Sequence, residues 1–344
     1  MKRALKWAGV GLLAVVLLLA APVIWVETAC RGPITPQDYR PLTTQTRDES
    51  RTFTTYPEWH IVHAYEDYAA TIAHADPHDF GFLRAIAGFW TSLCPLAEMA
   101  DAHGGFTTES RMTIYTIGVS FSAEMALKAA YEETLGRVAT WVRGPDHAAL
   151  DRLSAQQAAD YAAFLQMTPW YRWDFRRDAA ALGSASQGSF RDVERRLALG
   201  LEYRAKAVYA DLIAQAVAAT GQDELTLRAV VADLPPEALA AIPGVTVITT
   251  RPEAVEVETP RYRAFTLIAQ QIAAAGGSFV EIAGNDDILL TALAPAALPG
   301  ALSSHPRQGQ GDTRSLILTR VPDLSAVLNA LPAQGGRLEH IHDY

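Results

Sequence analysis

Apolar and polar residues follow different periods along this 344-residue chain, and the changes of period divide it into four regions. The first is an uncharged, almost wholly apolar run at residues 7–26, preceded by Lys2, Arg3 and Lys6. About 20 apolar residues allow a helix to cross the hydrocarbon core of a bilayer, and flanking basic residues favour the cytoplasmic side. Residues 1–31 are therefore predicted to form a single-pass anchor in the inner (cytoplasmic) membrane, with the bulk of the chain on the periplasmic side. The alternative is a cleaved signal peptide, whose apolar core is usually shorter, about 7–15 residues.

The second region, residues 32–52, is polar and contains several Pro and Thr residues, which predicts a linker. In the third, residues 53–243, apolar residues recur at helical spacing. Thr55 and Glu58 have the spacing of a capping box at the start of its first helix. The pattern predicts an α-helical, bundle-like domain. Its expected helices lie at about 56–74, 80–102, 108–142, 155–166 and 190–219, with a shorter one beginning near Asp223.

The helix predicted at 108–142 is apolar enough to raise the question of a second membrane span. Glu124 and Lys128 lie within it, and a charge at the centre of a bilayer costs about 2.5–3.5 kcal/mol. We therefore interpret it as a buried helix of the helical domain. Glu124 should be buried and paired, since an unpaired buried carboxylate is costly. Arg84, Arg111 or a histidine would be a structural partner.

The fourth region, residues 244–344, changes to strand-like runs separated by two helical runs. Each half reads strand, helix, Gly-Gly, strand, which is the order of a ferredoxin-like α+β domain. Residues 284–287, "GNDD", predict a hairpin into an extra strand, and residues 295–312 predict a long loop. The predicted fold class is therefore α+β, with an N-terminal transmembrane helix, a bundle-like helical domain and a ferredoxin-like domain.

Charge and cysteine content limit which partners and which cellular compartment are compatible with the sequence. Acidic residues outnumber Lys and Arg by 38 to 29, which argues against nucleic acid as a partner, because phosphate binding needs clustered basic residues. The chain has two cysteines, Cys30 and Cys94. An oxidising compartment would allow a disulfide between them. The alternative is that Cys94 is simply a buried apolar residue.

The stretch "TTYPEWHIVHAYEDYAA", residues 54–70, carries two histidines and three acidic residues. On a helix, His63 and Glu66 lie on one face and can contact each other. One hypothesis is an acid–base site in which His63 and Glu66 transfer protons and Glu124 is a buried carboxylate. The alternative is a surface His–Glu pair. A di-iron site requires Glu-x-x-His motifs on two helices. The chain has that spacing at Glu339 and His342, in its last strand-like run, so no metal is assigned.

A second unusual stretch, "TPWYRWDFRRD", combines aromatic rings with arginines. Such clusters occur in binding hot spots and at membrane headgroups. Trp170, Tyr171, Arg172 and Trp173 are therefore candidate interface residues for a protein or lipid partner. The alternative is that the rings cap the helical core.

The remaining chemistry is sparse. His340 and His342 share one face of the last strand, but two histidines without a third ligand do not make a metal site. We expect them to be solvent-exposed strand residues near the C-terminus. The sequence contains no P-loop, dinucleotide fingerprint, nucleophile elbow or haem motif, so no cofactor is assigned.

Two hypotheses for function follow from the sequence. The first is a membrane-anchored periplasmic module that binds or assembles a partner without catalysis. The second is a periplasmic enzyme, or a metal- or lipid-binding protein, with a site around His63, Glu66 and Glu124. The convergence of these three side chains on one cavity would favour the second.

Overall fold

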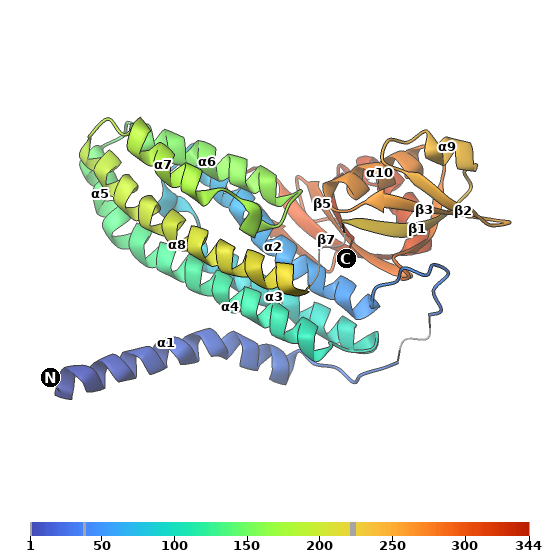
Figure 1. The fold of residues 1–344 in the computed structure, drawn as a ribbon, viewed down its shortest axis with the longest axis horizontal. Helices are drawn as coiled ribbons and strands as arrows, with labels where there is room; N and C mark the ends of the chain where they lie inside the picture. Colours follow the sequence, from blue (N-terminus) through green and yellow to red (C-terminus); the bar gives the residue numbers. More distant parts are fainter. Residues whose placement is uncertain (1, 37–38, 221–224, 344) are drawn as a thin grey trace.

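The computed structural model describes residues 2–36, 39–220 and 225–343. Helices form most of the chain as far as residue 220, and two four-stranded antiparallel sheets with their helices form the rest. Figure 1 shows the long helices packed lengthwise at one end of the molecule and the sheets at the other. The predicted mixture of helix and sheet is confirmed, as is an apolar helix at the N-terminus.

Helix α1 (Lys2–Ala29) carries the predicted apolar run. Among the described helices, its segment Gly9–Ala29 is the one long and apolar enough to cross a membrane, although a signal sequence passes the same test. Most of the side chains along this segment are exposed. The length and composition of α1 therefore fit a helix surrounded by lipid.

The end of α1 is fastened to the globular part. Cys30 forms a disulfide with Cys94 of α3 (Phe82–Ala102), with the two Cα atoms 4.9 Å apart. Arg31 adds an ion pair to Asp101 of the same helix, with Nε 2.6 Å from Oδ2. A covalent bond and an ion pair therefore fix the direction in which α1 leaves the rest of the structure.

The segment predicted as a linker, residues 32–52, contacts the sheet region. The Tyr39 hydroxyl donates to Oε2 of Glu281 at 2.8 Å, and the backbone N–H of Thr43 donates to Oε1 of the same carboxylate at 2.9 Å. The end of the predicted linker already belongs to a helix, which begins at Glu49.

Helix α2 (Glu49–Ile72) is the central element, and it begins earlier than predicted. It packs against α3 and against α6 (Ala149–Leu165) on the helical side. It also contacts strands β5 (Asp287–Ala294) and β8 (Arg337–His342). Both halves of the protein therefore pack on this one helix.

The capping box predicted at Thr55 and Glu58 is wrong, because Asp48 is the N-cap and both residues lie inside α2. The Thr55 hydroxyl donates to the carbonyl of Thr52 at 2.7 Å. Glu58 is therefore not a capping residue, and its carboxylate is available for another role.

The other helices lie close to their predicted positions, except for α7, which was not predicted. They are α4 (Thr108–Tyr131), a π-helical turn (Glu132–Gly136), α5 (Arg137–Arg143), α7 (Phe175–Ala185) and α8 (Phe190–Thr220). The π-helical turn joins α4 directly to α5, so residues 108–143 run as one long helical rod.

The core between these helices contains charged residues. Lys206 Nζ of α8 lies 2.8 Å from Glu124 Oε1 and 3.1 Å from Glu202 Oε1. The Tyr65 hydroxyl donates to Glu124 Oε1 at 2.6 Å, and Lys128 lies 3.0 Å from Glu202. The partner of Glu124 is thus a lysine from a distant helix, and the arginines and histidines proposed from the sequence are wrong.

A second buried ion network lies further along α8. Arg195 contacts Glu132 at 2.8 Å and Glu194 at 2.7 Å, and Arg191 contacts Asp151 at 2.8 Å. Both arginine side chains are 1% exposed. The face of α8 that packs into the protein is therefore strongly charged.

The sheets differ from the single ferredoxin-like sheet predicted over residues 244–344. The first has the order β2-β3-β1-β4 and the second β6-β7-β5-β8. The first comprises β1 (Thr226–Ala232), α9 (Pro236–Ala240), β2 (Thr246–Thr250), β3 (Val255–Pro260), α10 (Arg263–Ala274) and β4 (Ser278–Ile282). The second comprises β5, β6 (Ser303–Pro306), β7 (Thr313–Arg320), α11 (Leu324–Ala330) and β8.

Two local predictions in this region are wrong. β4 and β5 belong to different sheets, so residues 284–287 do not form a hairpin within one sheet. Strand β6 lies in the segment predicted as a loop, and it pairs with β7. Asp223, where a short helix was expected, lies outside the described residues, and strand β1 follows from Thr226.

Substitution Lys206→Met should lower the free energy of unfolding by about 1.5–3 kcal/mol, because it removes hydrogen bonds between charged groups, while Lys128 still contacts both carboxylates. Arg196→Gln, on the exposed side of the same helix, should change it by less than about 0.5 kcal/mol. Chemical denaturation of both variants measures the difference. Equal stability of the two variants would contradict the assigned ion pairs.

Candidate functional site

A cavity of about 400 Å³ opens where the helical part meets the sheet region. Its walls come from the first half of α2, the start of α4, the turn between β3 and α10, and the C-terminal end of β8. These segments are far apart in the sequence, and packing of the sheet region on α2 brings them together. The sequence stretch that opens α2 therefore lines a concave site.

Positive charge gathers in this cavity. Arg47, Arg51 and Arg261 line it, together with the hydroxyl-bearing residues Thr54, Thr55, Ser110 and Thr113. Arg51 Nε lies 3.5 Å from Ser110 Oγ, which links α2 to α4 across the wall. Guanidinium groups bind planar oxyanions in bidentate fashion. The wall composition is therefore suited to an anion.

The cavity also holds two carboxyl groups with raised pKa values. Glu58 faces the cavity and remains exposed to solvent there. Desolvation by the surrounding protein raises its pKa to about 7, against the opposing effects of Arg261 and Arg51. Burial likewise raises the pKa of Asp343 to about 6, against Arg261. Both groups can change protonation state near neutral pH.

The backbone beside Asp343 is held in an uncommon conformation. Tyr262 has φ of 62°, a value that residues other than glycine adopt rarely. Its N–H donates to Oδ2 of Asp343 at 2.7 Å, and the Arg261 guanidinium lies 5.1 Å from the centre of its ring. Strained backbone of this kind recurs at ligand sites. Asp343 fixes the turn that carries Arg261 into the cavity.

Trp59 forms an aromatic wall of the cavity, and histidines lie behind it. The ring of His340 stacks on Trp59 with centroids 3.5 Å apart, and His342 lies 5.1 Å from His340. Burial lowers the pKa of both imidazoles well below the usual range, so they are neutral. The expectation that the two histidines face solvent is wrong, because both are buried.

The predicted pair His63 and Glu66 is found next to this wall. His63 Nδ1 lies 3.1 Å from Glu66 Oε2, and its Nε2 lies 3.8 Å from Glu339 Oε2. Arg314 contacts Glu339 at 2.6 Å and Glu66 at 3.2 Å. Burial raises the pKa of Glu339, but His63 and Arg314 outweigh it and hold the pKa at about 2. These four residues, called here the α2–sheet ion cluster, form a closed set of ion pairs.

The three residues of the predicted acid–base site do not converge. His63 and Glu66 face the second sheet, whereas Glu124 pairs with Tyr65 and Lys206 inside the helical part. Within the described part of the chain, none of the three lines the cavity. An acid–base role for this trio stays a prediction. The alternative of a surface His–Glu pair is wrong, because His63 is buried.

The aromatic stretch is half-buried against the helices. The Trp173 indole donates to Oδ2 of Asp178 at 2.7 Å, and its ring lies 5.0 Å from that of Phe164. Trp170 lies 5.3 Å from Tyr209. These contacts fit the alternative in which the rings cap the helical core, and an interface role for Trp170, Tyr171, Arg172 and Trp173 stays a prediction.

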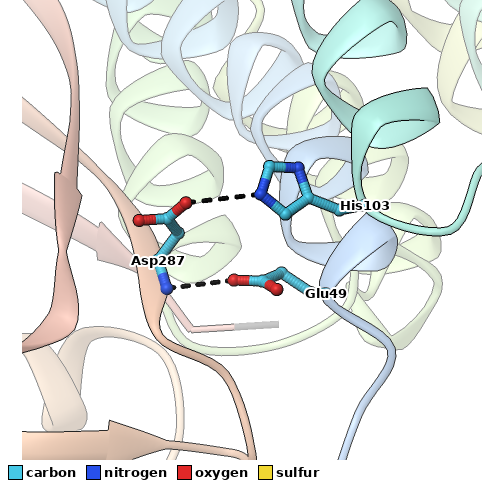
Figure 2. A group of neighbouring side chains, drawn as sticks. All are labelled: Glu49, His103 and Asp287. Atoms are coloured by element: carbon cyan, nitrogen blue, oxygen red, sulfur yellow. Dashed lines mark hydrogen bonds and ion pairs between the residues drawn. The ribbon is translucent and has the colours of Figure 1, made fainter. Parts of the chain in front are cut away.

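Side chains that could hold a cation lie at the same junction. Figure 2 shows His103, at the end of α3, and Glu49, at the start of α2, converging on Asp287 of β5. His103 Nε2 lies 3.4 Å from Asp287 Oδ2, and the backbone N–H of Asp287 donates to Glu49 Oε1 at 3.0 Å. His63, Glu66 and Glu339 form a similar group, but both of its carboxylates already pair with Arg314.

Sequence reasoning missed the cavity residues for identifiable reasons. Arg47 and Arg51 fell in the predicted linker, and Glu58 was explained by a capping box. Arg261 and Asp343 join them only through tertiary packing. The local signal that was available is the density of arginines and hydroxyls around residues 47–55.

Comparison of the chain with protein-family models, with curated proteins and with solved structures finds no match.

The junction in Figure 2 should weaken as pH rises. Contact with Asp287 raises the pKa of His103 to about 9 from an ordinary 6.5, and burial raises the pKa of Glu49 to about 7 from 4.5. Both groups bind protons more tightly in the folded state. Their stabilisation is therefore complete below the ordinary values and is lost as pH rises through about 7 and about 9.

The melting temperature of the wild type should consequently fall by several degrees between about pH 6 and about pH 9.5. His103→Gln should reduce that fall, because one of the two titrating groups is removed. Thermal unfolding across this range measures both proteins. Parallel pH profiles would show that His103 does not contribute.

Proposed function

We propose that this protein is a membrane-anchored binding protein whose cavity takes an anionic ligand bearing a phosphate or carboxylate group. The observation that carries the proposal is that three arginines and four serine or threonine residues line one cavity of about 400 Å³. Small-molecule sites usually have volumes of about 300–1,000 Å³. The first hypothesis from the sequence, a tethered binding module, is retained, with its site moved to this cavity.

The cavity also has apolar surfaces and carboxyl groups that can donate hydrogen bonds. Trp59 and Tyr262 supply ring surfaces, and Ile114 an aliphatic one. Glu58 and Asp343 become hydrogen-bond donors when protonated, as their raised pKa values allow. A ligand with one anionic group and a neutral, partly apolar remainder fits this combination of groups.

The position of the cavity supports a ligand from the membrane surface or from the adjacent solution. Ser110 and Thr113 of the cavity wall flank Arg111, whose Nε lies 3.6 Å from Glu27 near the end of α1. We propose that α1 spans the inner membrane with the rest of the chain in the periplasm. The basic residues before the apolar run support this orientation, and the disulfide fits an oxidising compartment.

We also propose a ferredoxin-like arrangement for each sheet, in place of one spanning both. The support is the repeated strand order, in which the first strand of each unit lies between the third and the fourth. In the second unit, a loop replaces the first helix. The helical part is proposed to be bundle-like, since its long helices pack lengthwise (Figure 1). A fold of this kind by itself implies no function.

A second candidate function is catalysis in the same cavity. Glu58 and Asp343 have pKa values raised toward neutrality beside three arginines. Such a pair can act as general acid and general base on a bound anion. This candidate replaces His63, Glu66 and Glu124 as the residues of a catalytic hypothesis.

Arg51→Gln should weaken anion binding about tenfold or more, because a hydrogen bond to a charged group contributes about 1.5–3 kcal/mol. Titration calorimetry on the full-length protein in phosphatidylcholine nanodiscs, with glycerol 3-phosphate as the probe, measures the change. Nanodiscs containing phosphatidic acid distinguish a lipid headgroup from a soluble phosphate.

The control for this experiment is Arg337→Gln, because Arg337 is largely exposed and its ion pair with Asp312 contributes little. It should bind as the wild type does. Absence of binding to both probes by the wild type, or equal losses in the two variants, would overturn the proposed function.

The affinity of the cavity for sulfate should fall as Glu58 ionises between about pH 6 and about pH 8, since its pKa is about 7 and a carboxylate repels the anion. Sulfate keeps its charge over this range, so the titration belongs to the protein. Glu58→Gln should bind more tightly at the higher pH and lose the part of the pH dependence centred at about 7, whereas the part that comes from Asp343, with a pKa of about 6, should remain. An unchanged pH dependence in this variant would place Glu58 outside the binding site.

A further inference from the structure

Two long helices of this protein combine buried ion pairs with large apolar side chains that are exposed, and among the exposed side chains of α8 are also Arg196 and Arg204. On α8, the buried side carries Arg191 and Arg195, each 1% exposed, whereas Leu201 is 71% exposed. Along residues 108–143, Leu127 is 72% exposed and Trp141 is 82% exposed. A helix that faces water has a mostly polar outer face.

These exposed side chains form one surface. α4 and α8 are joined by the ion pairs of Lys206 with Glu124 and of Lys128 with Glu202, and Figure 1 shows the two helices side by side. Large apolar side chains are exposed along both helices. The outer apolar face is defined by Leu127, Leu135, Trp141, Leu197, Leu201 and Leu212.

The charges inside α4 no longer argue against contact with lipid. Within residues 112–131, the ionisable side chains other than tyrosine are Glu124 and Lys128, and both point toward α8 and are paired. Charged groups in membrane proteins face the protein interior in this way.

The position of α1 next to α4 is the reason for assigning a bilayer, rather than another partner, to the outer apolar face. Its end is fixed by the disulfide to α3 and by the contact of Glu27 with Arg111 at the start of α4. From that point, α4 runs back alongside α1 (Figure 1). A bilayer that contains α1 must therefore also meet α4 and the helix next to it. Trp141, near the far end of the rod, is of the residue type that favours the membrane interface.

We propose that the outer apolar face lies in the acyl chains of the same bilayer that α1 crosses. The helical part is then embedded along one side, with α6 and α7 turned away from the lipid. This inference rests on the proposed membrane crossing of α1 and is independent of the ligand in the cavity. It replaces the interpretation of the protein as a soluble module on a single tether.

Site-specific quenching by brominated lipids tests this proposal on the full-length protein. Single variants Leu127→Cys and Leu201→Cys carry a bimane label, since the two native cysteines are joined to each other. Leu17→Cys in α1 is the positive control, and Ala159→Cys on the exposed side of α6 is the negative control. Each is reconstituted in phosphatidylcholine vesicles with or without bromines on the acyl chains.

The expected result is about twofold quenching at residues 127 and 201, similar to that at residue 17, with little at residue 159, because quenching requires contact within the hydrocarbon core. Quenching at residue 17 alone would overturn the inference and leave the anchor intact. That outcome includes the case in which a second copy covers the face. Absence of quenching at residue 17 as well would overturn both the inference and the anchor.

Discussion

The α2–sheet ion cluster is the interaction on which the rest of the structure depends. Arg314 of β7 holds Glu66 of α2 and Glu339 of β8 within 3.2 Å, in largely buried surroundings. Buried charges of this kind are costly unless every partner is in place, so they specify one arrangement rather than adding much stability. Because the cluster lies one to two turns beyond Trp59 on α2, it also sets the distance between the cavity wall and the strand that ends at Asp343.

Helix α2 carries charged contacts on two opposite faces. One face joins the sheet through Glu66, and the other reaches Glu124 and Lys206 through Tyr65. A helix in such a position cannot shift without breaking hydrogen-bonded groups on both sides. This constraint explains how residues from distant segments form a defined cavity, and it explains why the polar stretch at the start of α2 is not a simple amphipathic surface.

Local sequence signals predicted the elements well and their assembly poorly. Periodicity located the long helices, and alternation located most strands, because both patterns depend on neighbours along the chain. Strand pairing depends on distant segments, so β4 and β5 were placed in one sheet although they belong to two. The spacing of Thr55 and Glu58 matches that of a capping box, so Glu58 was not predicted as a residue of the cavity.

The central claim is that the ion cluster holds the helical part and the sheet region as one body with a fixed cavity between them. Double electron–electron resonance between spin labels at Ala159→Cys on α6 and Thr249→Cys on β2, both exposed positions, tests it most directly. The account predicts a single narrow distribution of distances in the wild-type background. A broad distribution, or one with two maxima, would show that the two parts move independently and that the cavity is not a fixed site.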